Sequence, residues 1–221
     1  MGEHVRAFRG LIHLGTLTLT GENSSDGVLT IERGTVRIGN GGTTGSIAGD
    51  VVNNGRLEFD RLDAVNFGGD ISGRGSLTNK GSGNVTLVSG NTYTGGTTIE
   101  KDSALTGTVK SFGTGKITDN GTLFINQATD ASFANVIDGD GKVTKQGAGD
   151  VTLANANTYK GGTTIKTGAL TGTVKSFGEG NIANDGTLVI DQATDASFAN
   201  VISGDGKVTK QGAGDVTLAN A

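Results

Sequence analysis

The sequence lacks cysteine, proline and tryptophan throughout its 221 residues. Without cysteine, disulfides and thiol chemistry are excluded. Without proline, every residue can donate a backbone hydrogen bond to a neighbouring strand. The only histidines are His4 and His13, and neither is accompanied by a nucleophile and a carboxylate in a suitable pattern. The sequence therefore does not predict nucleophilic catalysis through histidine or cysteine.

Charge and long apolar runs are also scarce. Charged residues make up 18% of the chain, and the formal net charge is −4. The lysines and arginines are scattered, whereas phosphate contacts need them clustered, so nucleic acid is not predicted as a partner. No apolar run approaches the roughly 18 residues of a membrane span, and the N-terminus lacks the apolar core of a secretory signal. If the protein is exported, its signal is expected to lie outside this chain.

Glycine is abundant, with 40 residues, and hydrophobic residues make up only 33%. Low hydrophobicity can accompany disorder, but disordered chains are rich in proline and net charge. Here the apolar residues are also spread evenly along the chain. The composition therefore predicts a folded chain with many small turns and a thin core.

Internal repetition is the dominant signal of the sequence. Residues 139–156 recur unchanged at 204–221, and two shorter segments recur with the same offset of 65. Looser copies stand further upstream: residues 54–87 match 120–153 at an offset of 66, and residues 15–31 match 83–99 at an offset of 68. The chain thus holds about three and a half large repeats.

A finer period runs within each large repeat. Short alternating runs recur at spacings from 20 to 24, centred on Leu57, Leu77, Ile99, Leu123, Val143, Ile165, Leu188 and Val208. Alternation over four or five residues, bounded by Gly, Asn and Asp, is typical of a half-buried strand. A unit of this length cannot bury its own apolar face, so it must stack on its neighbours.

The predicted fold class is all-β: a right-handed parallel β-helix with about 22 residues per coil and three coils per large repeat. The predicted division of the chain is a cap or fragment end at 1–14 and the β-helix at 15–221. Val, Leu, Ile and Phe are expected inside, while Gly and Asn are expected at left-handed corners. Residues 5–12 show a weak helical spacing.

The segment "GDGKVTKQGAGDVTLANANTYKGGTTI" at 139–165 resembles the passenger-associated transport repeat, also called the autotransporter-associated β-strand repeat. The matching positions are Gly139, Gly141, Val143, Lys145, Gly147, Gly149, Leu153, Asn157, Tyr159, Gly161, Gly162, Thr163, Thr164 and Ile165. The copy at 73–99 matches as well, except that Asn79 stands where the motif has Lys, and Lys80 follows it. The extended stretch at 166–190 departs from the family pattern and predicts an enlarged corner loop.

The resemblance implies a passenger of a Gram-negative type V secretion protein, displayed at the cell surface or released. In this family the repeat is thought to form the stem and to assist passage through the outer membrane. No C-terminal β-barrel pattern follows in this sequence, so the translocator domain is expected outside the chain. The implied partners are a host surface or matrix ligand, or sister passengers.

Several motifs allow a second interpretation. "DGDG" (138–141) is similar to part of a calcium loop, but another copy has Arg74 within the same turn, which favours turn geometry. "GNGGTTG" (39–45) lacks the G-K-[ST] of a phosphate loop. Tyr93 and Tyr159 stand beside paired glycines, where they either pack over a turn or present an exposed aromatic. Asn91 and Asn157 are expected at left-handed corners or in stacked ladders, and the threonine runs are too irregular for an ice-binding array.

Carboxylates are the remaining candidates for chemistry, because many β-helices cleave polysaccharides with two or three acids. Six aspartates recur between the copies: Asp130, Asp140, Asp150, Asp195, Asp205 and Asp215. Aromatic platforms for sugars are few, and Phe67, Phe133 and Phe198 occupy equivalent places that indicate core packing. No catalytic, cofactor or metal residue is assigned. The predicted function is a non-catalytic stem that supports export and adhesion or self-association; the alternatives are a carbohydrate-active β-helix and a pure spacer.

Overall fold

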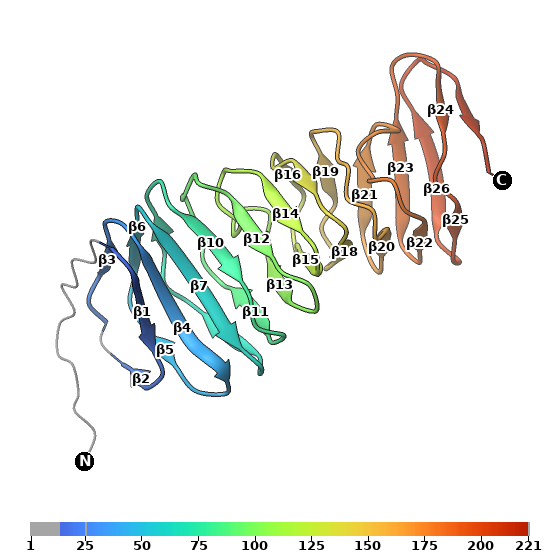
Figure 1. Ribbon diagram of the computed structural model, residues 1–221. Helices are drawn as coiled ribbons and strands as arrows, with labels where there is room; N and C mark the ends of the chain where they lie inside the picture. Colours follow the sequence, from blue (N-terminus) through green and yellow to red (C-terminus); the bar gives the residue numbers. More distant parts are fainter. Residues whose placement is uncertain (1–13, 25, 221) are drawn as a thin grey trace. The chain divides into compact units, whose positions relative to one another are not determined.

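The computed structural model describes residues 14–24 and 26–220, and every regular element in that part is a β-strand. The chain forms two compact units, one up to Thr118 and one from Asp119 onward. Each is a parallel β-solenoid in which successive turns stack strand on strand (Figure 1). Within the described part, no helix is long and apolar enough to cross a membrane. His4, His13 and the weak helical spacing at 5–12 lie outside it.

The first unit has three principal faces. One face holds β1 (Thr16–Leu19), β4 (Thr35–Gly42), β7 (Arg56–Arg61), β10 (Ser76–Asn79) and β12 (Thr97–Ile99). A second face holds β8 (Val65–Phe67), β11 (Asn84–Leu87) and β13 (Ala104–Gly107). The third holds β3 (Leu29–Ile31), β6 (Val51–Asn53) and β9 (Ile71–Ser72), and a short pair is formed by β2 (Glu22–Asn23) and β5 (Ser46–Ile47).

The second unit repeats this plan. One sheet holds β15 (Thr122–Asn126), β18 (Lys142–Gln146), β20 (Thr163–Ile165), β22 (Ile182–Asn184) and β25 (Ile202–Ser203). The next holds β16 (Ala131–Phe133), β19 (Val151–Leu153), β21 (Ala169–Gly172), β23 (Thr187–Asp191) and β26 (Lys207–Gln211), and β24 (Ala196–Phe198) pairs with β27 (Val216–Leu218). β14 (Ile117–Asp119) spans the boundary, and β17 (Ile137–Asp138) belongs to the second unit.

The all-β parallel β-helix is confirmed, but the usual step from one turn to the next is 20 rather than the expected 22. Leu57 pairs with Leu77, and Leu77 pairs with Thr97, each at this shorter step. Apolar alternation predicts the next strand centre at Ile99, two positions too late, because Ile99 is the apolar residue of that strand. Thr97 is polar yet buried, which conceals the true period.

The length of the large repeat is not equal to three whole turns of the solenoid. In the second unit β15 and β23 hold equivalent segments of two copies, yet they lie in different sheets. The same holds for β18 and β26, and for β16 and β24. Three steps of 20 fall short of the offset of 65 between these copies, so the copies are separated by three turns and part of a fourth. Each copy is therefore displaced by one face, and equivalent side chains do not line up along one surface.

The core consists of inward columns of aliphatic and aromatic side chains. Phe67, Phe133 and Phe198 are all buried, which confirms their predicted core packing. In the first unit the rings of Phe59 and Phe67 stand 5.7 Å apart, in the range of favourable aromatic pairs. Burial of each large apolar side chain stabilises the fold by about 1.5–3 kcal/mol.

The left-handed corners belong almost entirely to glycine. In the described part only Asp102, apart from glycines, has a positive φ, so the expected left-handed Asn91 and Asn157 are not found. Both asparagines instead bridge turns: Asn91 Oδ1 accepts from Ile71 N at 2.7 Å, and Asn157 Oδ1 accepts from Ile137 N at 2.8 Å. The amide side chain thus satisfies backbone groups where the strand ladder is interrupted.

Candidate functional site

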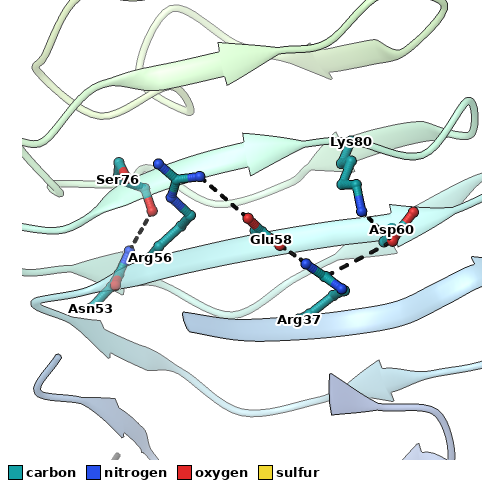
Figure 2. Close-up of polar contacts among 7 residues, drawn as sticks. All are labelled: Arg37, Asn53, Arg56, Glu58, Asp60, Ser76 and Lys80. Carbon is teal, nitrogen blue, oxygen red and sulfur yellow. Dashed lines mark hydrogen bonds and ion pairs between the residues drawn. The ribbon is translucent and has the colours of Figure 1, made fainter. Parts of the chain in front are cut away.

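The most distinctive surface of the first unit is a row of charged side chains on the outer side of β4, β7 and β10, here called the charged ladder. It consists of Arg37, Arg56, Glu58, Asp60 and Lys80, and Figure 2 shows how they face one another. The strand register explains the grouping, because Arg37 stands directly opposite Glu58 across the β4–β7 pair. Side chains at alternate positions of a strand share one face, so the segment "RLEFDR" (56–61) directs Arg56, Glu58 and Asp60 outward together.

Each acid of the charged ladder contacts two cations. Glu58 accepts from Arg37 Nε at 2.9 Å and lies 3.4 Å from Arg56 Nη1. Asp60 lies 3.1 Å from Lys80 Nζ and 3.9 Å from Arg37 Nε. Arg37 therefore links both carboxylates, while Arg56 and Lys80 occupy the two flanks (Figure 2).

Within the charged ladder, the two acidic side chains are buried more deeply than the flanking basic side chains. The side chains of Glu58 and Asp60 are only 9% and 11% exposed, whereas those of Arg56 and Lys80 are 54% and 45% exposed. Beside them lies an open groove of about 520 Å³, lined by Arg37, Arg56, Glu58, Thr78, Lys80, Glu100 and Lys101. The acids of the ladder lie beneath its cations, and the exposed Lys101 and Glu100 complete the groove, so the lining carries four cations and two acids.

The fold does not require these charges. In the next copy, at an offset of 66, the four positions of Arg56, Glu58, Asp60 and Lys80 hold Thr122, Phe124, Asn126 and Gln146. Both copies nevertheless form paired parallel strands with the same register. The cluster was not predicted, because the basic residues are scattered along the sequence and meet only in the folded turns. The signal that could have found it is the alternation in 56–61 combined with the step of 20 from Asp60 to Lys80.

Most of the recurrent aspartates with a described contact, in contrast, accept hydrogen bonds from backbone N–H groups of the next turn. Asp130 Oδ1 accepts from Asp150 N at 2.9 Å, and Asp150 Oδ1 accepts from Ala169 N at 2.8 Å, each one turn further along. In the last copy Asp195 Oδ1 accepts from Asp215 N in the same way. Asp140 instead pairs with Lys160 at 3.1 Å on the exposed surface. These carboxylates link successive turns, which explains why they recur without aromatic platforms.

Tyr93 and Tyr159 pack in the core, as the turn interpretation predicted, and neither is exposed. The Tyr159 hydroxyl lies 2.7 Å from Thr163 Oγ1, and that Oγ1 donates to the Phe177 carbonyl at 2.9 Å. Because the threonine proton is committed to the carbonyl, the tyrosine hydroxyl donates to Oγ1. Burial raises the pKa of Tyr159 well above its usual value. The motif residues Tyr and Thr thus build one buried hydrogen-bonded chain across two turns.

Lys145 is fully buried and closes a corner of the second unit. Its Nζ donates to the Gly147 carbonyl and to the Thr167 carbonyl of the next turn, both at 2.8 Å. In the preceding copy Asn79 takes this place and donates to Gly83 O and Ala104 O. Burial lowers the pKa of Lys145, and the charge of Asp150 partly offsets this. The lysine of the family motif is therefore a corner plug that ties two turns together.

The described residues contain no group of three or more His, Asp or Glu side chains that could hold a metal ion. The "DGDG" turn at 138–141 is built on the left-handed Gly139, with φ of 102°, which agrees with its interpretation as turn geometry. The carboxylates of Asp130, Asp150 and Asp195 accept from backbone amides, and Asp140 pairs with Lys160. The candidate site is thus the charged ladder with its groove, a surface suited to contact.

Comparison with known proteins identifies the repeats. The model of the passenger-associated-transport-repeat family matches residues 14–38, 77–101 and 143–171. The chain carries passenger-associated transport repeats. These matches fall on the first, second and third copies recognised in the sequence, and they include the weak copy near the N-terminus.

Two curated proteins resemble these transport repeats. The adhesin BmaC autotransporter of Brucella suis is 53% identical over 62 residues, which is 28% of this chain and 2% of that protein. The uncharacterized lipoprotein YdeK of Escherichia coli is 29% identical over 205 residues, which is 87% of this chain and 15% of that protein. The chain thus spans only a small part of either relative. No solved structure matches the chain.

Proposed function

We propose that this repeat segment is a non-catalytic stem and adhesive surface of an autotransporter passenger. The observation that carries the proposal is the match of three segments to the transport-repeat family on a parallel β-solenoid. The adhesin name of one relative supports the adhesive part of the role. The passenger would act at the cell surface or after release, held by or cleaved from a translocator domain elsewhere in its protein.

The charged ladder is the proposed contact surface. The acids of the ladder are covered, and the cations of the groove outnumber its one exposed acid, Glu100, so the groove favours an anionic ligand such as a sulfated or carboxylated polysaccharide. Because the next copy folds without these charges, their presence in one copy supports a role in contact rather than in folding. Binding of this kind is screened by salt over about 8–10 Å, so it is expected to weaken as ionic strength rises.

Replacing Arg56 by Thr and Lys80 by Gln tests this surface, because it installs the residues of the next copy. The double variant R56T/K80Q is expected to bind dextran sulfate and host cells at least about tenfold more weakly, a loss of about 1.4 kcal/mol. Its stability should change by no more than about 1–2 kcal/mol, since exposed ion pairs contribute about 0–1 kcal/mol each and Arg37 still pairs with both acids. Binding is measured with the purified chain by surface plasmon resonance, with uncharged dextran as the reference ligand.

A matched control removes two exposed lysines elsewhere, Lys110 and Lys175, and leaves the groove intact. If this control weakens binding as much as R56T/K80Q, the effect reflects overall charge and the assignment of the groove is wrong. Sedimentation of the same variants distinguishes sister passengers from a foreign ligand. Self-association that is lost only in R56T/K80Q would make a second passenger the partner of this surface.

Export is proposed to proceed turn by turn, because each turn hydrogen-bonds its neighbours and a formed turn is a template for the next. Deletion of residues 123–162 removes two turns and joins Thr122 to Thr163, which occupies the register of Leu123. Surface display of the complete passenger is expected to slow in a pulse-chase experiment. Unchanged export kinetics in a folded deletion variant would remove the main support for this role.

A further inference from the structure

One corner of the second unit begins with an aspartate where its two copies begin with an asparagine. The three equivalent corners read Asn-Asn-Gly (53–55), Asp-Asn-Gly (119–121) and Asn-Asp-Gly (184–186). The first side chain of each corner points inward and is buried, with exposures of 0%, 0% and 1% for Asn53, Asp119 and Asn184. The middle copy thus places a carboxyl where the other two place an amide.

In the two amide copies the side chain ties its corner to the next turn. Asn53 Nδ2 donates to the Ser76 carbonyl at 2.8 Å, as Figure 2 shows. Asn184 Nδ2 donates to the Lys207 carbonyl at 3.0 Å. Asn53 Oδ1 meanwhile accepts from Gly55 N at 3.1 Å, so both ends of this amide are used.

Asp119 makes the same contacts with neighbouring backbone N–H groups as Asn53 does. Its Oδ1 accepts from Gly121 N at 3.0 Å, just as Asn53 Oδ1 accepts from Gly55 N. Its backbone carbonyl accepts from Gly141 N at 2.7 Å, which matches the bond from Gly75 N to Asn53 O. Asp119 Oδ2 therefore stands where the asparagines have their donating nitrogen, and the equivalent carbonyl belongs to Lys142.

Asp119 Oδ2 is buried without a hydrogen-bond partner. An ionised carboxylate has no proton to donate, so it faces the lone pairs of a carbonyl and gains nothing. A protonated carboxyl has one O–H donor and reproduces the bond that asparagine makes in the other copies. A buried polar atom left without a partner costs about 1–3 kcal/mol, and an uncompensated charge costs more.

We propose that Asp119 is a neutral carboxylic acid in the folded chain, donating Oδ2–H to the Lys142 carbonyl, and that this corner is a pH-sensitive joint between two turns. Loss of the proton removes the bond between residues 119 and 142 and leaves a charge in the core. The hydrogen bond between the two turns is therefore present in acid and is lost at neutral and higher pH.

The surroundings of Asp119 agree with this assignment. Burial raises the pKa of Asp119 to about 7, partly offset by the backbone N–H groups of Gly121 and Leu123. On β17 and the following turn, Asp138 is half-buried, and Asp140 and Lys142 are exposed. From the segment before β20, the buried Tyr159 faces Asp119, and the charge of Asp119 contributes to the raised pKa of that hydroxyl. No cationic side chain is among the causes that act on Asp119.

The sign of the pH dependence follows from the two pKa values. In the unfolded chain the carboxyl titrates near 3.8, and in the folded chain near 7, so the folded state binds the extra proton between these values. The contribution of Asp119 to stability is fully present below about pH 4 and is lost as the pH rises through about 7. Since each pKa unit is a factor of ten, the folded-to-unfolded ratio should fall about a hundredfold to a thousandfold across this window.

Asp119→Asn tests the proposal directly, because it installs the residue of both other copies. Urea unfolding of the complete chain is followed by circular dichroism at several pH values from 4 to 8. The unaltered chain is expected to lose stability across this range, while D119N lacks this loss and is the more stable protein at pH 8. D140N, which alters an exposed acid nearby, should retain the pH dependence of the unaltered chain.

The carboxyl ¹³C shift of Asp119 in the unaltered chain provides a second measurement that does not depend on how D119N folds. A folded-state titration near pH 7 supports the proposal. An Asp119 that is already ionised at pH 5, or a D119N protein with the pH dependence of the unaltered chain, would overturn it.

Discussion

Gly69→Ala is expected to destabilise the first unit by about 3 kcal/mol, while Gly68→Ala at the neighbouring position leaves stability nearly unchanged. A Cβ on Gly69 would collide with the carbonyl oxygen of Gly49 in the preceding turn and approach the Phe67 ring at 2.9 Å. A Cβ on Gly68 would meet nothing within 4 Å. Neither glycine has a φ in the left-handed region, so the contrast is purely steric.

The physical reason is the spacing between turns. Parallel strands lie about 4.8 Å apart, and at this corner the backbones of two turns meet without a side chain between them. The Gly49 carbonyl is part of the backbone and cannot rotate away, so the strand pairing itself must shift. Replacement of Gly68, in contrast, adds no contact and should change stability by at most a gain of about 0.4 kcal/mol, because alanine restricts the unfolded chain.

Urea unfolding of G68A and G69A, followed by far-UV circular dichroism, measures the difference. The two variants carry the same added methyl group, so composition and helix or strand preference cancel between them. Equal stabilities would show that the turns are not packed as closely at this corner as the structure places them.

The second large effect is expected at Lys145. Its replacement by alanine removes both of its hydrogen bonds to the Gly147 and Thr167 carbonyls and leaves a void in the core. The Thr167 carbonyl then loses its donor, at a cost of about 1–3 kcal/mol, while the Gly147 carbonyl still accepts from Thr167 Oγ1 at 3.1 Å. With the void left by the buried alkyl stem, the loss of stability should reach about 3 kcal/mol.

The chain provides its own control for this prediction. Lys210 stands in an identical local sequence in the next copy, but it is exposed, and its Nζ reaches only the Gly212 carbonyl, at 2.7 Å. Replacement of Lys210 by alanine should therefore change stability by less than about 0.5 kcal/mol, as is usual for surface positions. Similar losses for K145A and K210A in thermal or urea unfolding would contradict the role of Lys145 as a corner plug.

The comparison of Lys145 with Lys210 also shows where sequence reasoning reaches its limit. The two lysines lie in the identical segments 139–156 and 204–221, yet one is buried and the other exposed. Burial in a solenoid is decided by the turn that stacks on top, which lies elsewhere in the sequence. No local pattern can therefore assign the role of either lysine.

The strand period illustrates a second limit. Apolar alternation predicted the strands and the stacked turns, since these follow from hydrophobic spacing and glycine corners. It misplaced the centres at Ile99 and Ile165, because the residues in register, Thr97 and Thr163, are polar. Their burial depends on the tyrosine and carbonyl partners that neighbouring segments supply.

The sequence by itself determined the repeats, the parallel solenoid and the resemblance to the transport-repeat family, because each depends on the order of residue types within a few turns. Only the tertiary structure decided the exact step between turns, the displacement of each large copy by one face, and the meeting of Arg37, Glu58 and Asp60. It also buried Asp119 with one carboxyl oxygen, Oδ2, left without a hydrogen-bond partner. These features depend on the register between turns, which is set by the packing of whole turns on one another.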